Sequence, residues 1–317
     1  MISVIIPVYN RKDFYMQALR SLSNQTLSMG EFETIVVSNI SLITPELPFK
    51  CRIILTEDTT LSGKLALGIE YSEGEIISFL EDDDLFSPDK LSEVKNAFEI
   101  HGVSFYANRH IKFKSTTYPS ELLDRKKETQ PKVATITTFG NREVCNLMKL
   151  GINHNLSSMS ISKGFAIEIK EYLKGLRVGY VDSFIFYSAI VRNKTIGYCA
   201  SGRPSTVVRI HKANSRSYFL IKDDQNIEAN RLIDSIVHLS DSFNPSITII
   251  CTMMHMDYLD ESIKMHLLKR REAFSDLVGM IKDPYVISLR KDLIIKALIY
   301  FISPNMQTLS LIVFGKF

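Results

Sequence analysis

Short apolar runs alternate with amphipathic segments through the first 107 residues of this chain. The runs have the length and composition of buried strands, and the segments between them repeat apolar residues at helical spacing. Strands are expected at residues 3–10, 32–37, 52–56, 75–80 and 103–107, and helices at residues 13–25, 62–71 and 89–100. Strands that alternate with helices in this way form a parallel, doubly wound sheet. The expected fold class is therefore α/β, with a Rossmann-like, mostly parallel sheet flanked by helices.

The pattern continues less regularly to residue 217, and its character then changes. Residues 110–130 are polar and charged, which predicts a loop or an edge hairpin. Further strands are expected at residues 157–162, 195–200 and 206–210, and helices at residues 141–150, 163–173 and 181–192. Helical patterns follow at residues 224–240, 247–271 and 284–301. The sequence thus predicts a domain at residues 1–217 and a helical C-terminal region at residues 218–317.

Four consecutive acids, Glu81 to Asp84, follow the strand expected at residues 75–80. Adjacent carboxylates repel one another, so a chain that gathers them at the end of a strand favours a cation there. Ser87 and Pro88 suit the start of the next helix, as its cap and its first turn. Ligands of open α/β sheets bind beyond the carboxyl ends of the strands, where these acids are expected. A solvated acidic loop is the alternative.

Composition limits the classes of function. The net charge of +3 is too small to favour nucleic acid as a partner. The four cysteines lie far apart with no metal-binding spacing, which is simplest to explain by reduced thiols in the cytoplasm. The first strand begins directly after Met1, and no apolar run reaches the length of a spanning helix. We therefore expect a cytoplasmic protein.

Three stretches together carry a resemblance to a known family: residues 3–11, residues 21–26, and the strand, acidic run and helix start at residues 74–91. They are similar to the corresponding motifs of the family 2 glycosyltransferases, in order, within the first 217 residues. The resemblance implies the GT-A fold and inverting transfer of a sugar from a nucleotide-sugar, with Mn²⁺ or Mg²⁺ as cofactor. It favours a UDP-sugar, with a GDP-sugar as the other donor, and a glycan or lipid-linked acceptor.

The resemblance also assigns the metal site. Alignment on Leu85 and the Pro-Asp-Lys that follows puts the family's Asp-x-Asp motif on residues 81–83, with Asp84 as the next acid. Asp83 is the best single metal ligand on this alignment. The implied ligand set is Asp83, Glu81, Asp84 and His211. Glu81 stands where the family usually has Asp, which is one departure from the pattern.

The donor pocket is implied at the ends of the first strands. The donor-binding residues are Pro7, Val8, Tyr9, Asn10, Arg11, Asn39, Lys64, Asp82 and Arg209. The family usually has an acid after the second strand, where this chain has Asn39. The identity of the nucleobase that the donor carries is therefore left open. Lys64 takes the place of the family's Arg as a partner of the diphosphate, or is a solvated lysine at the end of a helix.

Asp182 matches the family's catalytic base, which removes a proton from the acceptor hydroxyl. Its position also suits a helix cap, and one residue can serve in both ways. His154 and Asn155 lie in the region that contacts the acceptor in relatives, although loop chemistry explains them equally well.

The final segment, residues 259–317, holds nine basic and six acidic residues, so the whole positive excess lies there. Basic amphipathic helices can lie on an anionic membrane surface, which would put the protein at the cytoplasmic face of the membrane. Packing on the catalytic domain or on another subunit of an oligomer is the alternative. For the domain itself, one alternative is a GT-A module that binds nucleotide-sugar without catalysis. The other is a sugar nucleotidyltransferase, which would be expected to have a glycine-rich phosphate loop after the first strand, whereas residues 7–11 contain no glycine.

Overall fold

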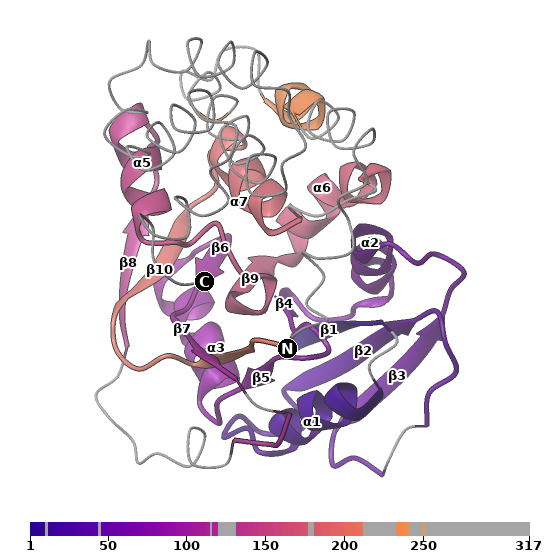
Figure 1. The fold of residues 1–317 in the computed structure, drawn as a ribbon. Helices are drawn as coiled ribbons and strands as arrows, with labels where there is room; N and C mark the ends of the chain where they lie inside the picture. The colour runs from indigo at the N-terminus through magenta and orange to yellow at the C-terminus, as the bar shows by residue number, and fades with distance from the viewer. Residues whose placement is uncertain are drawn as a thin grey trace, which may run out of the picture.

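The computed structural model describes residues 1–9, 12–43, 46–114, 116–119, 131–176, 181–211, 233–240 and 250. In this part of the chain, eight strands form one sheet in the order β3-β2-β1-β4-β9-β6-β10-β8 (Figure 1). Their bounds are β1 Ile2–Val8, β2 Phe32–Ser38, β3 Lys50–Leu55, β4 Ile76–Phe79, β6 Phe105–Ala107, β8 Lys132–Ile136, β9 Met159–Ser162 and β10 Ile196–Ser201. The expected α/β class with a large, mostly parallel central sheet is confirmed.

The direction of the strands was predicted only in part. β1 pairs in parallel with β2 and β4, β2 pairs in parallel with β3, and β6 pairs in parallel with β10. β9 is antiparallel to both of its neighbours, β4 and β6, and β8 is antiparallel to β10. The parallel pairing expected for the first part of the chain is found between β1, β2, β3 and β4. No direction was predicted for β9 and no strand at β8, because the apolar pattern of a strand carries no information about the direction of its neighbours.

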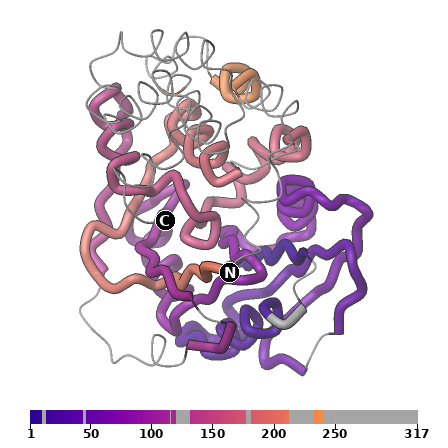
Figure 2. Tube along the Cα trace, viewed as in Figure 1, coloured from indigo at the N-terminus to yellow at the C-terminus, as the bar shows by residue number. Residues whose placement is uncertain are grey.

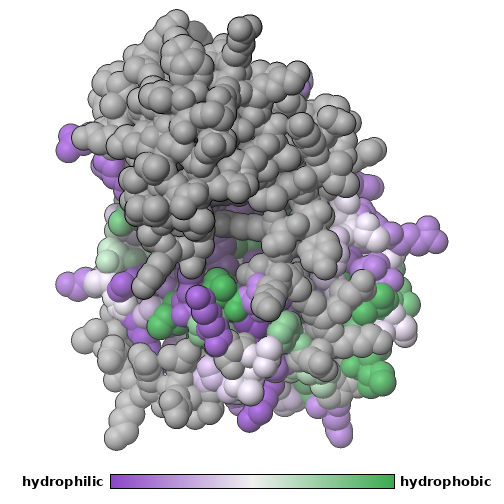
Figure 3. Space-filling model, in the orientation of Figure 1, coloured by the Kyte–Doolittle hydropathy of each residue, from purple (hydrophilic) through white to green (hydrophobic). Residues whose placement is uncertain are grey.

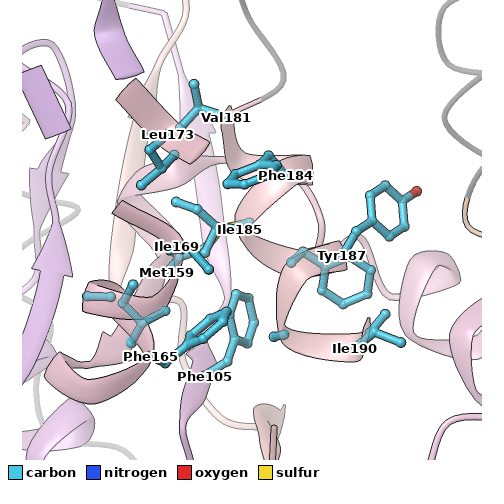
Figure 4. Packing of buried hydrophobic residues seen from close by; sticks show 14 of the residues in the cluster. Phe105, Met159, Phe165, Ile169, Leu173, Val181, Phe184, Ile185, Tyr187 and Ile190 are labelled. Carbon is cyan, nitrogen blue, oxygen red and sulfur yellow. The ribbon is translucent and has the colours of Figure 1, made fainter. Parts of the chain in front are cut away.

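Helices cover both faces of the sheet. Their bounds are α1 Lys12–Ser23, α2 Leu61–Tyr71, α3 Lys90–His101, α5 Asn141–Lys149, α6 Lys163–Gly175 and α7 Val181–Val191. Side chains alternate between the faces along β1: Val4 and Ile6 join the core under α1 and α3, whereas Ile5 joins the core under α2, α6 and α7. Figure 4 shows the second core, where residues of α6 and α7 converge on Phe105 and Met159 of the sheet.

A second, smaller sheet lies beside the acidic run. Its order is β5-β11-β7, with bounds Leu85–Phe86, Thr206–Arg209 and His110–Phe113. β11 runs antiparallel to β5 and parallel to β7. The sequence predicted β11 but missed β5, because two residues are too few to show a period. This sheet brings residues that are more than 100 positions apart in the chain to one place.

Two helix starts illustrate the local chemistry. Thr60 caps α2 by accepting a hydrogen bond from the backbone N–H of Gly63. Ser87 was expected to cap the helix after the acids, but α3 begins at Lys90, and the carbonyl of Ser87 accepts a bond from the Lys90 N–H. That expectation was wrong because Ser87 and Pro88 belong to the turn before the helix.

The C-terminal predictions fall mostly beyond the described residues. Residues 233–239 are helical, in agreement with the predicted helix at residues 224–240. The boundary near residue 218 and the segments at residues 251–317 lie outside the described part of the chain. Among the helices that are described, none has the length and apolar character needed to cross a bilayer.

The trace in Figure 2 runs from the indigo N-terminal strand β1 to the salmon helices α6 and α7, which pack on the opposite face of the sheet from α1. Large apolar side chains exposed to solvent include Ile43, Leu55 and Ile100, which lie on or beside different elements. Figure 3 shows hydrophobic and hydrophilic residues interspersed over the described part of one face. Single exposed apolar residues of this kind are ordinary for a folded protein.

Candidate functional site

The acidic run forms a tight turn at the carboxyl end of β4. The Asp84 N–H donates to the carbonyl of Glu81 at 3.1 Å, which closes the turn. The Glu81 N–H donates to the Ser157 hydroxyl at 3.0 Å, which ties the turn to the segment before β9. Asp82, Asp83 and Asp84 are all buried. The three aspartates therefore lie inside the protein rather than in solvent. Their side chains point in different directions, toward different partners.

Asp82 faces the end of β1. Its Oδ2 accepts a hydrogen bond of 2.7 Å from the Tyr9 N–H. The buried Lys64 of α2 donates to the Val8 carbonyl at 2.8 Å and to Asn39 Oδ1 at 2.7 Å, with its Nζ 4.5 Å from the centre of the Tyr9 ring. Burial lowers the pKa of Lys64 to about 8, and the charges of Asp82 and Asp58 oppose that shift. The ends of β1, β2 and β4 are thus joined around one lysine.

Asp84 faces the opposite side of the turn and is 2% exposed. Its Oδ1 accepts a bond of 2.9 Å from the Arg209 N–H, and its Oδ2 accepts one of 3.2 Å from Asn155 Nδ2. Burial and the neighbouring Asp83 raise the pKa of Asp84 to about 7, while the Ser157 hydroxyl and the other donors oppose the shift. Both oxygens are therefore engaged within the protein.

Asp83 meets His211, which follows β11. Asp83 Oδ2 and His211 Nε2 lie 2.8 Å apart, and their side chains are 10% and 11% exposed. A carboxylate oxygen at the rim of a sheet suits Mn²⁺ or Mg²⁺, because such ions complete their coordination with substrate phosphate and water, whereas the imidazole nitrogen is a softer ligand that suits Mn²⁺ better than Mg²⁺. These two side chains supply two of the ligands that a divalent cation would need.

The larger ligand set is not assembled. Among the described residues, no three His, Cys, Asp or Glu side chains are gathered so that they could hold a metal ion together. Asp84 is turned toward Arg209 and Asn155, and the Glu81 backbone is tied to Ser157. Of the four predicted ligands, the structure brings Asp83 and His211 together and gives Asp84 a supporting position beside them. The sequence could not separate these roles, since neighbouring acids in a turn point in different directions.

Asp182 lies in the first turn of α7, with its Oδ1 accepting a bond of 2.9 Å from the Ser183 N–H. Its Oδ2 accepts a bond of 3.0 Å from the backbone N–H of Asn155. Asn155, at a φ of 72°, also reaches Asp84 through its side chain. Asn tolerates this left-handed conformation better than most residues. One residue therefore links the predicted base to the acidic turn.

The two predicted acceptor residues differ in their surroundings. His154 is exposed, and its Nε2 lies 3.4 Å from the side-chain nitrogen of the buried Asn153. The Asn155 side chain is occupied at both ends, since its Oδ1 accepts a bond of 2.7 Å from the Ser158 hydroxyl. The structure thus gives Asn155 a bridging position, whereas His154 is open to solvent next to it.

The remaining donor residues are placed as follows. Pro7 and Val8 end β1, and Asn39 follows β2, all at the carboxyl edge of the sheet. Asn10 and Arg11 lie outside the described residues. The Arg209 side chain is 1% exposed and packs among the residues that surround Asp83.

Sequence reasoning missed Ser157. Its side chain supports Glu81 and Asp84, and its carbonyl accepts a bond of 3.1 Å from the Thr206 hydroxyl of β11. No spacing or motif singles out this serine in the sequence. Its position depends on β9 returning next to β4.

Comparison with known proteins finds a match to one family and a similarity of fold to solved structures. Residues 3–156 match the family described as Glycosyl transferase family 2. A Haemophilus influenzae protein named "Uncharacterized glycosyltransferase" is 34% identical over 104 residues, which are 31% of this chain and 35% of that protein. The Bacillus subtilis "Minor teichoic acid biosynthesis protein GgaB" is 31% identical over 114 residues, which are 31% of this chain and 12% of that protein. The chain spans about a third or less of the length of these curated relatives.

Two solved structures share the fold over most of this chain. S. aureus TarS in complex with UDP-GlcNAc has a TM-score of 0.59 at 16% identity, over 93% of this chain and 81% of that chain. A mannosyltransferase, PcManGT from Pyrobaculum calidifontis, in complex with GDP-Man and Mn²⁺, has a TM-score of 0.55 at 12% identity, over 95% of this chain and 86% of that chain. At these identities the likeness concerns the fold.

Proposed function

We propose that this chain, whose residues 3–156 match glycosyl transferase family 2, transfers a sugar from a nucleoside-diphosphate sugar to an acceptor hydroxyl with inversion. The GT-A fold expected from the resemblance is confirmed by the fold that it shares with TarS and the mannosyltransferase. The observation that carries the proposal is the pairing of Asp83 with His211 at 2.8 Å, linked through Asp84 and Asn155 to Asp182.

The donor end of the proposed site is the cluster of Tyr9, Asn39 and Lys64. The Tyr9 ring offers an aromatic face to a nucleobase, and Lys64 holds the Asn39 carbonyl oxygen, so the amide nitrogen of Asn39 is left to donate to the base. A UDP-sugar is our first candidate and a GDP-sugar the second. Support comes from the fold neighbours, whose structures contain UDP-GlcNAc, UDP and GDP-Man.

Asp83 and His211 are the residues that would hold Mn²⁺ or Mg²⁺ next to the donor diphosphate. The bound cation supplies positive charge that stabilises the departing nucleoside diphosphate. Asp84 keeps the turn in place through its bonds to Arg209 and Asn155, and Asp82 does the same toward Tyr9. These hydrogen bonds thus hold the acidic turn in one conformation before the donor binds.

Asp182 is the proposed general base at the acceptor end. The acceptor oxygen bonds to the anomeric carbon, the bond from that carbon to the diphosphate breaks, and the acceptor proton passes to the Asp182 carboxylate. Two backbone N–H groups, from Asn155 and Ser183, hold this carboxylate in one orientation. Its remaining lone pairs can accept the hydroxyl proton. We place the acceptor, a glycan or a lipid-linked glycan, next to His154.

The proposal is tested by calorimetric titration with UDP-GlcNAc, GDP-Man and other nucleotide-sugars, with and without Mn²⁺. We expect one of these donors to bind more tightly with Mn²⁺ and to release its nucleoside diphosphate. Asp83→Ala removes the Mn²⁺-dependent gain, whereas Glu99→Ala, at an exposed acid of α3, keeps it. Binding without release of the nucleotide would favour a module that has lost catalysis, and absence of any nucleotide binding would contradict the function.

A further inference from the structure

Arg209 was expected from the sequence to contact the donor diphosphate, but its surroundings suit a different role. We propose that Arg209 is a positioning residue that holds the Asp83–His211 pair in the arrangement required for a divalent cation. This inference rests on the proposed function, in which the Asp83–His211 pair binds the divalent cation. It concerns a residue more than 120 positions from Asp83 in the chain.

The faces of the Arg209 guanidinium are covered on two sides. Its central carbon lies 4.5 Å from the centre of the Phe14 ring of α1 and 4.5 Å from the centre of the Phe113 ring of β7. A planar cation stacks on aromatic faces in this way, and the stacking fixes the plane of the side chain. With the residue 1% exposed, the guanidinium is part of the interior.

The edge of the guanidinium is directed at protein oxygens. Its Nε donates to the Asp83 carbonyl at 3.0 Å, and one terminal nitrogen donates to Gln17 Oε1 at 2.7 Å. The other terminal nitrogen makes a longer bond of 3.4 Å to the Thr117 carbonyl. A diphosphate would require the donor fork to be open for bidentate contact. Here the fork is used to tie the acidic turn to α1 and to the segment after β7.

Arg209 reaches both ligand-bearing segments of the pair. Its side chain holds the Asp83 carbonyl, and its own N–H bonds Asp84 Oδ1 at 2.9 Å. His211 follows two residues later, and its ring packs on Phe14, with the ring centres 5.0 Å apart. Phe14 therefore touches both Arg209 and His211. Loss of the flat guanidinium would loosen Asp83 directly and His211 through Phe14.

The test compares UDP affinity with and without Mn²⁺ in Arg209→Lys, which keeps the charge and loses the plane and the fork. We expect metal-free UDP affinity to stay as in the wild type, and the Mn²⁺-dependent gain to fall by about 10- to 100-fold, the usual effect of removing a residue that orients metal ligands. Arg20→Lys is the matched control, since Arg20 also stacks on a ring, that of Tyr118 at 4.5 Å. The control should keep the full gain.

Two outcomes would overturn the role. A fall in metal-free UDP affinity with the Mn²⁺ gain intact would mean that the guanidinium contacts the diphosphate, and an unchanged gain would mean that Arg209 does not position the pair. Phe14→Leu provides a second variant that keeps the arginine, with a smaller loss of gain expected, in case Arg209→Lys does not fold.

A readout without nucleotide separates this inference from the proposed function. The His211 ring signals in NMR spectra, assigned with His211→Gln, should be broadened by Mn²⁺ at lower concentration in the wild type than in Arg209→Lys. If wild-type protein binds no nucleotide but its His211 signals respond to Mn²⁺ and the variant's do so less, the function fails and the positioning role stands. Equal responses in the two proteins would contradict the positioning role.

Discussion

At the scale of single residues, the candidate site depends on which atoms of each polar residue form its hydrogen bonds. Asn155 was selected from the sequence as a contact to the acceptor, yet its backbone N–H holds Asp182 and its side chain holds Asp84. Asp182 was selected as a base and lies at a helix start, where two N–H groups fix its oxygens. The sequence identifies the functional groups of these residues, whereas the fold determines their hydrogen-bond partners.

The first prediction concerns Asp182→Asn. The amide oxygen can still accept the bond from the Asn155 N–H, whereas the amide nitrogen cannot accept the one from the Ser183 N–H. The fold and the binding of the donor should be kept with one bond lost, but the side chain no longer takes a proton. We expect kcat to fall by about 100- to 10,000-fold, the usual contribution of a positioned base. Single-turnover rates and donor titration measure the two effects separately. Near-normal turnover would show that another group is the base.

At the scale of elements, α2 is held against β1 by close packing at Gly68. A Cβ built on Gly68 would lie 2.5 Å from a methyl carbon of Ile5, which is buried in the sheet. Gly68 therefore lets α2 approach the sheet closely enough for Lys64 of the same helix to reach the Val8 carbonyl. The packing of this helix and the position of Lys64 in the proposed donor site are therefore linked.

The second prediction compares two helical glycines. Gly68→Ala should lower the free energy of unfolding by about 1–3 kcal/mol, because the added methyl group overpacks the core. Gly164→Ala in α6, where a Cβ meets nothing within 4 Å, should leave stability unchanged or raise it by up to about 1 kcal/mol. Urea denaturation of both variants measures the difference. Equal midpoints for the two variants would contradict close packing at Gly68.

α3 and β6 share a buried polar network. Lys90 of α3 donates to Asn108 Oδ1, and Glu93 of α3 accepts a bond of 2.5 Å from the Tyr106 hydroxyl. Burial lowers the pKa of Lys90 to about 7, with the charge of Glu93 opposing the shift. Burial also raises the pKa of Glu93. These groups titrate differently in the folded and the unfolded chain.

The third prediction follows from the pKa of Lys90. The unfolded chain keeps the Lys90 proton to about pH 10, whereas the folded chain loses it near pH 7. Between these values the unfolded state binds more protons, so Lys90 makes the free energy of unfolding rise with pH, by on the order of 1 kcal/mol per pH unit. Denaturation at about pH 7.5 and 9 should show this rise in the wild type and a smaller one in Lys90→Met. Parallel pH profiles would contradict the buried, depressed lysine. Glu93 acts in the opposite direction and at lower pH, since its pKa is raised.

At the scale of the whole molecule, the sequence separates a neutral catalytic part from a C-terminal segment with the positive excess. Residues 259–317 carry nine basic and six acidic residues, and this segment lies outside the described part of the chain. We propose that it contacts an anionic membrane surface and brings the site to a lipid-linked acceptor at the cytoplasmic face.

The fourth prediction tests that contact. Full-length protein should float with vesicles that contain anionic lipid and remain in the dense fraction with neutral vesicles, and about 0.5 M salt should release it, because salt screens charges near the surface. Protein that stays in the dense fraction under all conditions would instead favour packing of the segment on the domain or on a second subunit. Sedimentation of the free protein then distinguishes these two arrangements.

The sequence by itself determined the α/β class, the edge of the sheet where the candidate site lies, and the acids and histidine proposed to give that site its chemistry. Apolar periodicity and strand-end position are local properties, so they can be read without neighbours. Only the tertiary structure decided which of the acids pairs with His211, that Ser157 and Asn155 support the turn, and that Arg209 is enclosed between Phe14 and Phe113. Those contacts depend on the antiparallel insertion of β9 and on the small second sheet, which bring distant segments together. No local pattern encodes such pairings, because a strand is apolar whichever neighbour it binds.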